Sequence, residues 1–385
     1  MNRYCGNSII LILLVIIGLL AGCENESLPE ILPSGKTVRI GVIAPISGVD
    51  ESIGKNGLAG IKAALQVQPY LLNGDKIDIV LEDDGSDANL TVAAAKKLVH
   101  QEKVAAILVL SRSSSVLALS ELADTLETPF LALISSHPLV TNTKWAAQLI
   151  FDDESQGIIS ALYVRDELLM DSVTVFKQID DLHSVFLADQ FVMKFKESGG
   201  RVRVVGIGDQ NIGYKELLEG LSPQEQNFFY MPIDASQVLQ IEKATRELGM
   251  QPQVMVSDGV AGNILLQFED DVTLLNGMMA VDVFSNNAKK TEYGRLMEKS
   301  FNENFQEPGT TLAALGCEGM SYLLMAMQKC GDSTDRECIK NKIRSHETFM
   351  GFSGAFRIKT NGKIERPVFI NLIDDGKLKN IVKIY

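Results

Sequence analysis

The stretch VRIGVIAPISG at residues 38–48 joins a short, mostly apolar run to a turn that contains proline and glycine. An apolar run of this length that ends in turn residues is typical of a strand buried inside a sheet. Residues 57–66 then show helical spacing of apolar side chains, and a second apolar run, KIDIVLEDD at 76–84, ends in acids. A strand, a helix and another strand in this order predict a βαβ unit and a parallel sheet.

This alternation continues through residue 134 and starts again at residue 172. Two consecutive series of βαβ units predict an α/β protein with two lobes, each an open and mostly parallel sheet flanked by helices. Further strands are predicted at 104–110, 129–134, 172–177, 201–207, 227–232 and 253–258. Beyond these strands we expect helices at about 291–305, 311–329 and 337–344, and a hairpin formed by FSGAFRI (352–358) and PVFINLI (367–373).

The N-terminal segment is apolar and short. Residues 9–20 are twelve apolar residues, fewer than the roughly 20 that cross a bilayer, and this length suits the core of a secretory signal peptide. The following LAGC (20–23) resembles the lipobox of bacterial lipoproteins. We therefore expect residues 1–22 to be removed and Cys23 to carry a lipid, with an ordinary signal peptide as the alternative. The polar residues 23–36 are predicted to form a flexible tether.

The chain is acidic, with 49 aspartates and glutamates against 36 lysines and arginines and a net charge of −13 at pH 7. Nucleic-acid binding rests on basic side chains that neutralise phosphates, so we expect no nucleic-acid partner. No apolar run after Cys23 is long enough to span a bilayer. We expect a monomeric body that contacts the membrane through the lipid alone.

Three cysteines follow the predicted lipid site: Cys317, Cys330 and Cys338. Export implies an oxidising compartment, where disulfides form. Cys330 and Cys338 bracket a polar segment with turn residues, which predicts a local disulfide, although the other pairings remain open. Cys317 lies in a predicted helix and is expected to be a buried thiol. The cysteines and histidines lack zinc-ligand spacing, so neither a metal nor a cofactor is expected.

Serines follow two strands of the first predicted lobe. Ligands bind beyond the carboxyl ends of strands in open α/β sheets, so these residues are candidates for a site. Ser113 to Ser115 open a predicted helix, and Ser135 and Ser136 follow the next strand. A helix N-terminus has unpaired N–H groups and positive dipole character, so it can hold an anion such as a carboxylate. The simpler alternatives are that one serine only N-caps the helix and that Ser135 and Ser136 only form a turn.

Asp258 ends a strand of the second predicted lobe, where its carboxylate suits a cation such as an ammonium. The simpler alternative is an ordinary turn or cap aspartate. An anion-binding edge that faces a carboxylate-bearing edge would suit a zwitterion between the lobes. Other polar residues near these strand ends are not predicted to bind a ligand. We expect the pair Asp152-Asp153 to be solvated loop charges, and His137 and His183 to be surface or loop residues.

Enzyme motifs are missing from the sequence. The segment GFSG at 351–354 is not the G-x-S-x-G nucleophile elbow, and Gly206, Gly208 and Gly213 do not have the dinucleotide-binding spacing. We therefore expect a binding protein and not an enzyme.

Several segments together resemble the type I periplasmic solute-binding proteins of ABC importers, in particular the group that binds branched-chain amino acids. These segments are IGVIAPISG (40–48), IVLEDDGSD (79–87), SRSSS (111–115), SSHP (135–138), VSDGV (256–260) and GFSGAFRIKTNGK (351–363). Their order and spacing along residues 37–385 carry the resemblance.

The resemblance implies two lobes joined by three crossings, which close on a ligand by a hinge motion. It places lobe 1 at residues 37–149 and 285–350 and lobe 2 at residues 150–284 and 351–385. It also implies roles for single residues: Ser113 and Ser136 would hold the ligand carboxylate, Ser135 would add backbone contacts, and Asp258 would hold the ammonium.

The sequence departs from the family where aromatic side chains often line the pocket. Those positions hold Ile53, Leu182 and Asp234. Losing aromatic walls changes the shape of ligand that fits. Asp234 would either favour a more cationic ligand or face solvent.

The function that the resemblance implies is a lipid-anchored, extracytoplasmic component of an ABC transporter. It would capture an amino acid or a similar small zwitterion and deliver it to a permease. The alternative is an envelope lipoprotein of the same fold that acts outside transport, as a sensor or regulatory partner.

Overall fold

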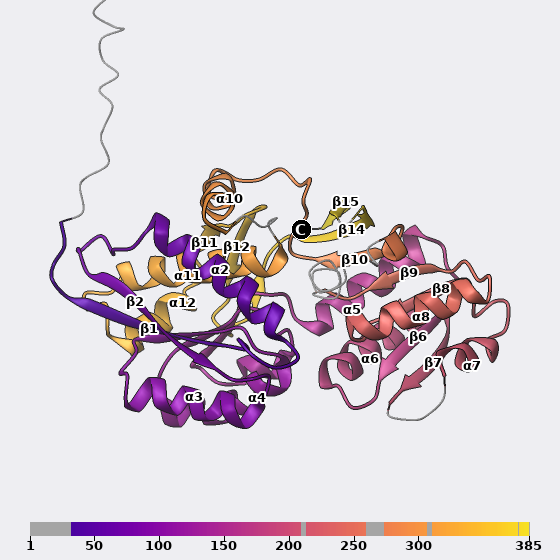
Figure 1. The fold of residues 1–385 in the computed structure, drawn as a ribbon, viewed down its shortest axis with the longest axis horizontal. Coiled ribbons are helices and arrows are strands. Elements are labelled where there is room, and N and C mark those ends of the chain that lie inside the picture. Colours follow the sequence, from indigo (N-terminus) through magenta and orange to yellow (C-terminus); the bar gives the residue numbers. More distant parts are fainter. Residues whose placement is uncertain (1–31, 209–212, 259–272, 306–309, 376, 385) are drawn as a thin grey trace, which may run out of the picture.

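The computed structural model describes residues 32–208, 213–258, 273–305, 310–375 and 377–384. The predicted signal peptide, Cys23 and most of the predicted tether lie outside these residues. The described chain forms two α/β lobes side by side (Figure 1). None of the described helices has the length and apolar character needed to cross a membrane.

The sheet of lobe 1 has five parallel strands in the order β2-β1-β3-β4-β5. Their bounds are Thr37–Ala44 (β1), Lys76–Asp83 (β2), Ala106–Val109 (β3), Phe130–Ala132 (β4) and Ala146–Gln148 (β5). The apolar runs are buried in the sheet as predicted, because helices cover both of its faces. One face packs on α3 (Ala88–His100) and α4 (Ser113–Leu126), and the other on α2 (Glu51–Val67) and α11 (Thr311–Gln328).

Helices α2 and α11 touch along their backbones, although they are far apart in sequence. A Cβ atom on Gly60 of α2 would lie 2.0 Å from the carbonyl oxygen of Ala313, and one on Gly316 of α11 would lie 2.1 Å from that of Gly57. Glycine at these positions therefore permits the contact. This side of lobe 1 also carries α10 (Glu292–Phe305) and α12 (Arg336–Ile343).

The sheet of lobe 2 has seven strands in the order β15-β14-β10-β9-β8-β6-β7. The parallel strands are Ser172–Gln178 (β6), Arg201–Ile207 (β7), Phe228–Met231 (β8), Gln253–Val256 (β9) and Met279–Asp282 (β10). Two antiparallel strands, Val368–Asp374 (β14) and Lys377–Ile384 (β15), extend the edge beside β10. Helices α5 (Asp153–Leu162) and α6 (Leu182–Glu197) cover one face, and α7 (Tyr214–Glu219) and α8 (Ala235–Glu247) cover the other.

The predicted hairpin between 352–358 and 367–373 is wrong. Strand β12 (Ala355–Ile358) pairs with β11 (Thr348–Met350) and β13 (Ile364–Glu365), whereas β14 pairs with β10 and β15. An alternating apolar pattern marks a strand but does not select its partner, and the two segments join different sheets.

The small sheet of β11, β12 and β13 lies beside lobe 1. Its loop accepts a hydrogen bond at the carbonyl of Gly362 from the N–H of Gln148, at 2.9 Å. The expected lobe boundary between residues 350 and 351 would divide this sheet. We therefore propose that the third crossing between the lobes follows Glu365, and that the first two follow β5 and β10.

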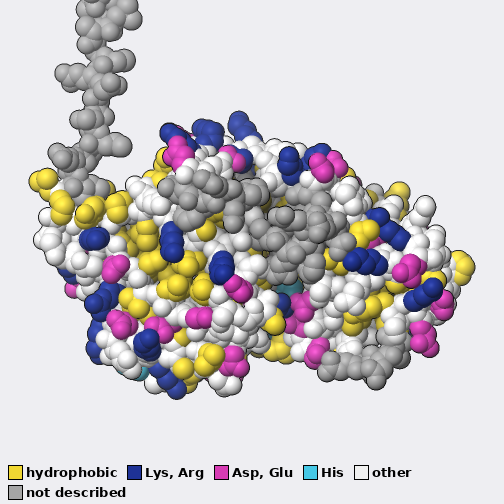
Figure 2. Space-filling model, in the orientation of Figure 1, with side chains coloured by type: hydrophobic (Ala, Val, Ile, Leu, Met, Phe, Trp, Pro, Cys, Tyr) yellow, Lys and Arg dark blue, Asp and Glu magenta, His cyan; other side chains and the backbone are white. Residues whose placement is uncertain are grey.

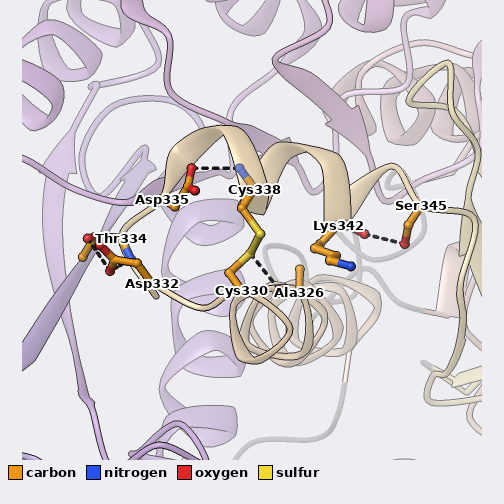
Figure 3. The surroundings of a disulfide bond; sticks show 8 residues. All are labelled: Ala326, Cys330, Asp332, Thr334, Asp335, Cys338, Lys342 and Ser345. Carbon is orange, nitrogen blue, oxygen red and sulfur yellow. Dashed lines mark hydrogen bonds between the residues drawn. A yellow bond between two sulfur atoms is a disulfide. The ribbon is translucent and has the colours of Figure 1, made fainter.

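A disulfide joins Cys330 and Cys338, as predicted, with their Cα atoms 6.0 Å apart (Figure 3). The loop that it closes reaches the start of β1, because Lys36 Nζ donates to Asp332 at 2.9 Å. Asp335 in the same loop accepts from the N–H of Cys338 at 3.0 Å and so caps α12. Cys317 is a buried free thiol whose Sγ donates to the carbonyl of Gly60.

Candidate functional site

A cavity lies between the two lobes, beyond the carboxyl ends of their strands. It encloses about 890 Å³ of space free of protein atoms, including solvent at its mouth. Figure 2 shows acidic, basic and histidine side chains gathered where the lobes meet. The aliphatic side chains that line the cavity are those of Ile53, Ile134, Ile150, Leu182, Ile233, Leu312 and Leu315, together with Ala235 and Pro232. The described residues that line it include no Phe, Tyr or Trp, in agreement with the departures noted at positions 53, 182 and 234.

The structure brings together the predicted ligand-binding residues. The ones that line the cavity are Ser113, Ser136, Leu182, Asp234 and Asp258. Ser135 lies behind this wall, where its buried hydroxyl donates to the Oγ of Ser113 at 3.1 Å. Ser135 therefore positions Ser113 within the wall of the cavity.

The N-terminus of α4 presents the serines to the cavity. The helix begins at Ser113, and the N-cap residue before it is Arg112, whose side chain does not bond to the helix N–H groups. The alternative in which a serine N-caps this helix is therefore wrong. Its first turn contains no acid. The first N–H groups of a helix have no partner within it, so this positive end is available to an anion beside Ser113 and Ser114.

Helices α5, α6 and α8 of lobe 2 begin differently. Asp152 caps α5 by accepting from the N–H of Ser155 at 2.9 Å, and Asp181 caps α6 by accepting from the N–H of Ser184 at 2.6 Å. Asp234 occupies the N-cap position of α8, although its side chain does not bond to that helix. Aspartates thus stand at the positive ends of these helices.

His183, the second residue of α6, stands between two buried carboxylates. Its Nδ1 lies 3.0 Å from Asp153 and its Nε2 lies 4.0 Å from Asp258. The hydroxyl of Ser136, from lobe 1, is 3.3 Å from Nδ1. Burial opposes the charge of His183, but the neighbouring carboxylates outweigh it and raise its pKa to about 10. His183 is therefore cationic at neutral pH.

Asp258 is nearly buried and is held by the side chain of Gln156 in α5. The amide Nε2 of Gln156 donates to Oδ1 of Asp258 at 2.6 Å, and the N–H of Asp258 donates to Oε1 of Gln156 at 3.0 Å. Burial raises the pKa of Asp258 to about 6, although the charge of His183 opposes the rise. Asp258 is thus mainly ionised at pH 7 and close to the point at which it takes up a proton.

Arg112 links the lobes across the mouth of the cavity. Its Nε and Nη2 donate to both carboxylate oxygens of Asp50, at 2.7 to 2.9 Å. Its Nη1 donates to Asp234 of lobe 2 at 2.8 Å. These two carboxylates outweigh burial and raise the pKa of Arg112 above its usual value. Asp234 is 37% exposed, so it lies both in an ion pair and at the edge of solvent.

Sequence reasoning missed several residues of this site. Asp153 is fully buried and paired with His183, so the plain explanations of these two residues as a solvated charge and a loop histidine are wrong. His137 is also buried, beside the ring of Phe186. His183 and Arg112 both follow strands at the edge where ligands bind, and that position was the available signal. Their partners could not be found from the sequence, because they lie far along the chain. The partners of His183 are at least 30 positions away, and those of Arg112 are at least 62 positions away.

Comparison with known proteins agrees with this arrangement. A family model described as periplasmic binding protein matches residues 37–377. A curated relative from Pseudomonas aeruginosa, named amino acid binding protein, is 27% identical over 224 residues. That alignment covers 56% of this chain and 54% of the relative, so it spans about half the length of each.

Solved structures share the two-lobed fold. The leucine-binding protein LivK of Thermotoga maritima is 27% identical with a TM-score of 0.82, over 90% of this chain and 98% of that chain. LivJ of Streptococcus pneumoniae, solved with isoleucine, is 17% identical with a TM-score of 0.80, over 91% and 100%. A transporter solute-binding protein of Rhodopseudomonas palustris, solved with 3,4-dihydroxybenzoic acid, is 18% identical with a TM-score of 0.80, over 90% and 97%. The last two identities support the fold alone, and the predicted fold class is confirmed.

Proposed function

The chain belongs to the periplasmic binding protein family, and from this premise we propose that it is the lipid-anchored solute-binding component of an ABC transporter. Membership in this family agrees with the expected extracytoplasmic location and with the expectation of a binding protein that is not an enzyme. The ligand we propose is an amino acid or a similar small zwitterion, held between the two lobes.

One observation carries the proposal. The open N-terminus of α4, with Ser113 and Ser114, shares a cavity with Asp258 of the opposite lobe. Unpaired N–H groups and hydroxyls suit a carboxylate, whereas an ionised and nearly buried carboxylate suits an ammonium. Ser136 adds a further hydroxyl to the anion side, and it lies beside the cationic His183.

Charge balance favours a ligand with an ammonium over a plain carboxylic acid. Asp153 and Asp258 share one resident cation, His183, so two buried carboxylates meet one positive charge. An unpaired buried charge is costly, and a ligand ammonium would supply the missing partner. An amino acid, such as the isoleucine bound to LivJ, therefore suits this cavity better than the dihydroxybenzoic acid bound to the Rhodopseudomonas palustris protein.

Two contacts support closure of the lobes on the ligand. Arg112 reaches Asp234 across the cavity, and Ser136 reaches His183. Both pairs join lobe 1 to lobe 2, so they would form on closing and break on opening. The closed surface would be what a permease recognises.

The proposed lipid at Cys23 would tether the protein without blocking this cavity. The first described residues lie at the edge of lobe 1 remote from lobe 2 (Figure 1). A radiolabelled lipid precursor should label the wild-type protein and leave Cys23→Ser unlabelled. Equal labelling of both proteins would contradict the anchor.

Thermal unfolding of the full-length protein in mild detergent tests the function. Amino acids, small peptides, amides and carboxylates would be added one at a time. A ligand at a hundredfold excess over its Kd stabilises the folded state by about 2.7 kcal/mol. We expect a shift with one class of zwitterion, reduced in Ser136→Ala and in Asp258→Asn. A folded and ligand-free protein that responds to no member of the panel would favour the alternative role as a sensor or regulatory lipoprotein.

A further inference from the structure

The Asp234 carboxylate lines the cavity, but neither charged group of the proposed zwitterion is assigned to it. It stands at the N-cap position of α8 without bonding to that helix, and one of its oxygens accepts from Nη1 of Arg112. Its position in the wall of the cavity places it within reach of a ligand held at Ser113, which follows Arg112 in the chain.

Arg112 does not fully balance Asp234. The guanidinium is already engaged by Asp50, which is 3% exposed and takes three of its contacts. The cluster of Asp50, Arg112 and Asp234 therefore holds two carboxylates and one cation. Because Asp50 has more contacts with Arg112 and is more buried than Asp234, the excess negative charge falls on Asp234.

The second cluster of the cavity repeats this imbalance. Asp153 and Asp258 hold one cation, His183. Among the described residues that line the cavity, the cations are Arg112 and His183, one in each cluster. The α-ammonium of an amino acid would compensate one cluster, and the cluster at Asp234 would stay negative.

The walls between the clusters suit an alkyl chain. Ile53, Leu182, Ile233 and Leu315 line the same cavity. Long cationic side chains commonly bury their methylene stem along such apolar surface and place the charged end in a polar environment. A ligand of this kind would contact the aliphatic walls and end at Asp234.

We propose that the ligand is a basic amino acid, with its α-carboxylate at the N-terminus of α4, its α-ammonium at Asp258 and its side-chain cation at Asp234. This inference rests on the proposed capture of a zwitterion and adds the class of its side chain. Asp234 is then a specificity-determining residue.

Isothermal titration calorimetry on the full-length protein in detergent tests the inference with matched probes. Ornithine, lysine and arginine carry the second cation; norvaline, norleucine and citrulline are their neutral counterparts. We expect the best basic probe to bind about tenfold or more tightly than its neutral counterpart, as for a charge-assisted hydrogen bond. Asp234→Asn should remove most of this preference. Because the change also alters the Arg112 contact between the lobes, the quantity compared is the ratio of the basic to the neutral affinity within each protein.

The exposed Asp166 offers a matched control, because Asp166→Asn removes the same charge outside the cavity. It should keep the preference for the basic probes. Equal binding of the basic and the neutral member in all three pairs, or tighter binding of an acidic amino acid than of any basic probe, would overturn the inference while the proposed capture of a zwitterion stands. Binding of none of these amino acids would also overturn the inference, and the thermal-unfolding panel would then decide whether another zwitterion binds.

Discussion

Helix α4 of lobe 1 and helix α6 of lobe 2 both start at the cavity, but they begin in opposite ways. On lobe 1, α4 starts after Arg112 with a run of serines and no acid, and its N–H groups are open to a ligand. On lobe 2, α5 and α6 each start with an aspartate that bonds to the helix, and α8 starts after Asp234. The same structural feature, a helix N-terminus after a parallel strand, is thus open to an anion at α4 and already matched by a side chain at α6.

This difference would let two similar lobes bind the two ends of the proposed zwitterion. Both lobes place helix N-termini at the cavity, so the backbone alone would make both edges positive. Aspartates at the starts of α5, α6 and α8 offset this charge on lobe 2, whereas the first turn of α4 on lobe 1 has no acid. The carboxylate and the ammonium of a zwitterion then have different lobes to bind, and ligand binding would draw the lobes together.

The largest effect on stability is expected from removing His183, the cation that pairs with the buried Asp153 and Asp258 of lobe 2. His183→Ala leaves Asp153 as a buried carboxylate without its ion-pair partner. We expect the free energy of unfolding to fall by about 3 kcal/mol, as when one member of a buried pair is removed. Urea denaturation at pH 7 measures it. His100→Ala, at an exposed position in the last turn of α3, is the control, and equal losses in both variants would contradict the role of His183.

The next effect concerns the carboxylate proposed to bind the ammonium. Asp258→Asn keeps the shape of the side chain and removes its charge. The affinity for the zwitterion should fall by about thirtyfold, or about 2 kcal/mol, as for a hydrogen bond to a charged group. Calorimetric titration measures this change, and an unaltered affinity would place the ammonium elsewhere.

The pKa of Asp258, raised to about 6, predicts opposite responses of binding and folding to pH. Ammonium binding needs the ionised form, so affinity should fall about tenfold between pH 7 and pH 5. The folded state binds this proton more tightly than the unfolded state does. The contribution of Asp258 to stability is therefore greatest at low pH and declines as pH rises from about 4 to about 6.

Both responses should disappear in Asp258→Asn. Comparing titrations and urea midpoints of the wild type and this variant at pH 4, 5, 6 and 7 isolates the group. Parallel pH profiles for the two proteins would show that another group titrates.

A smaller effect is expected on the anion side. Ser136→Ala removes one hydroxyl from an edge that also has the α4 N–H groups, so the affinity should fall by about fivefold, or about 1 kcal/mol. Ser345→Ala is a control, because that hydroxyl bonds to the carbonyl of Lys342 at the end of α12 (Figure 3). A loss that was the same in both variants would count against carboxylate binding at Ser136.

The smallest effect on stability is expected from placing an acid at the start of α4, as at the helix starts of lobe 2. Ser114→Asp places an acid in the first turn of α4 and should raise the free energy of unfolding by about 0.5 kcal/mol through the helix dipole. The same change should repel the ligand carboxylate and abolish binding. Ser114→Asn is the neutral control. Retained binding in Ser114→Asp would show that the carboxylate does not lie at this end of the helix.

Much of the fold follows from local sequence patterns. The apolar runs at 38–44, 104–110 and 253–258 are strands, because a short apolar segment bounded by turn residues suits burial inside a covered sheet. The expectation that ligands bind beyond the carboxyl ends of strands also selected residues that the structure brings together, since Ser113, Ser114 and Asp258 line one cavity. The partner of β12 was missed, because alternation carries no information on which strand pairs with which.

The sequence by itself determined which residues stand at the ends of strands and which segments are helix, strand or turn, because spacing and turn chemistry act over a few residues. Only the tertiary structure decided how the charges pair. Asp50 and Asp234 meet at Arg112 from distant parts of the chain, and Asp153 and Asp258 meet at His183. Such pairing depends on how two lobes pack and close, and buried charges are stable only where that packing supplies a counter-charge.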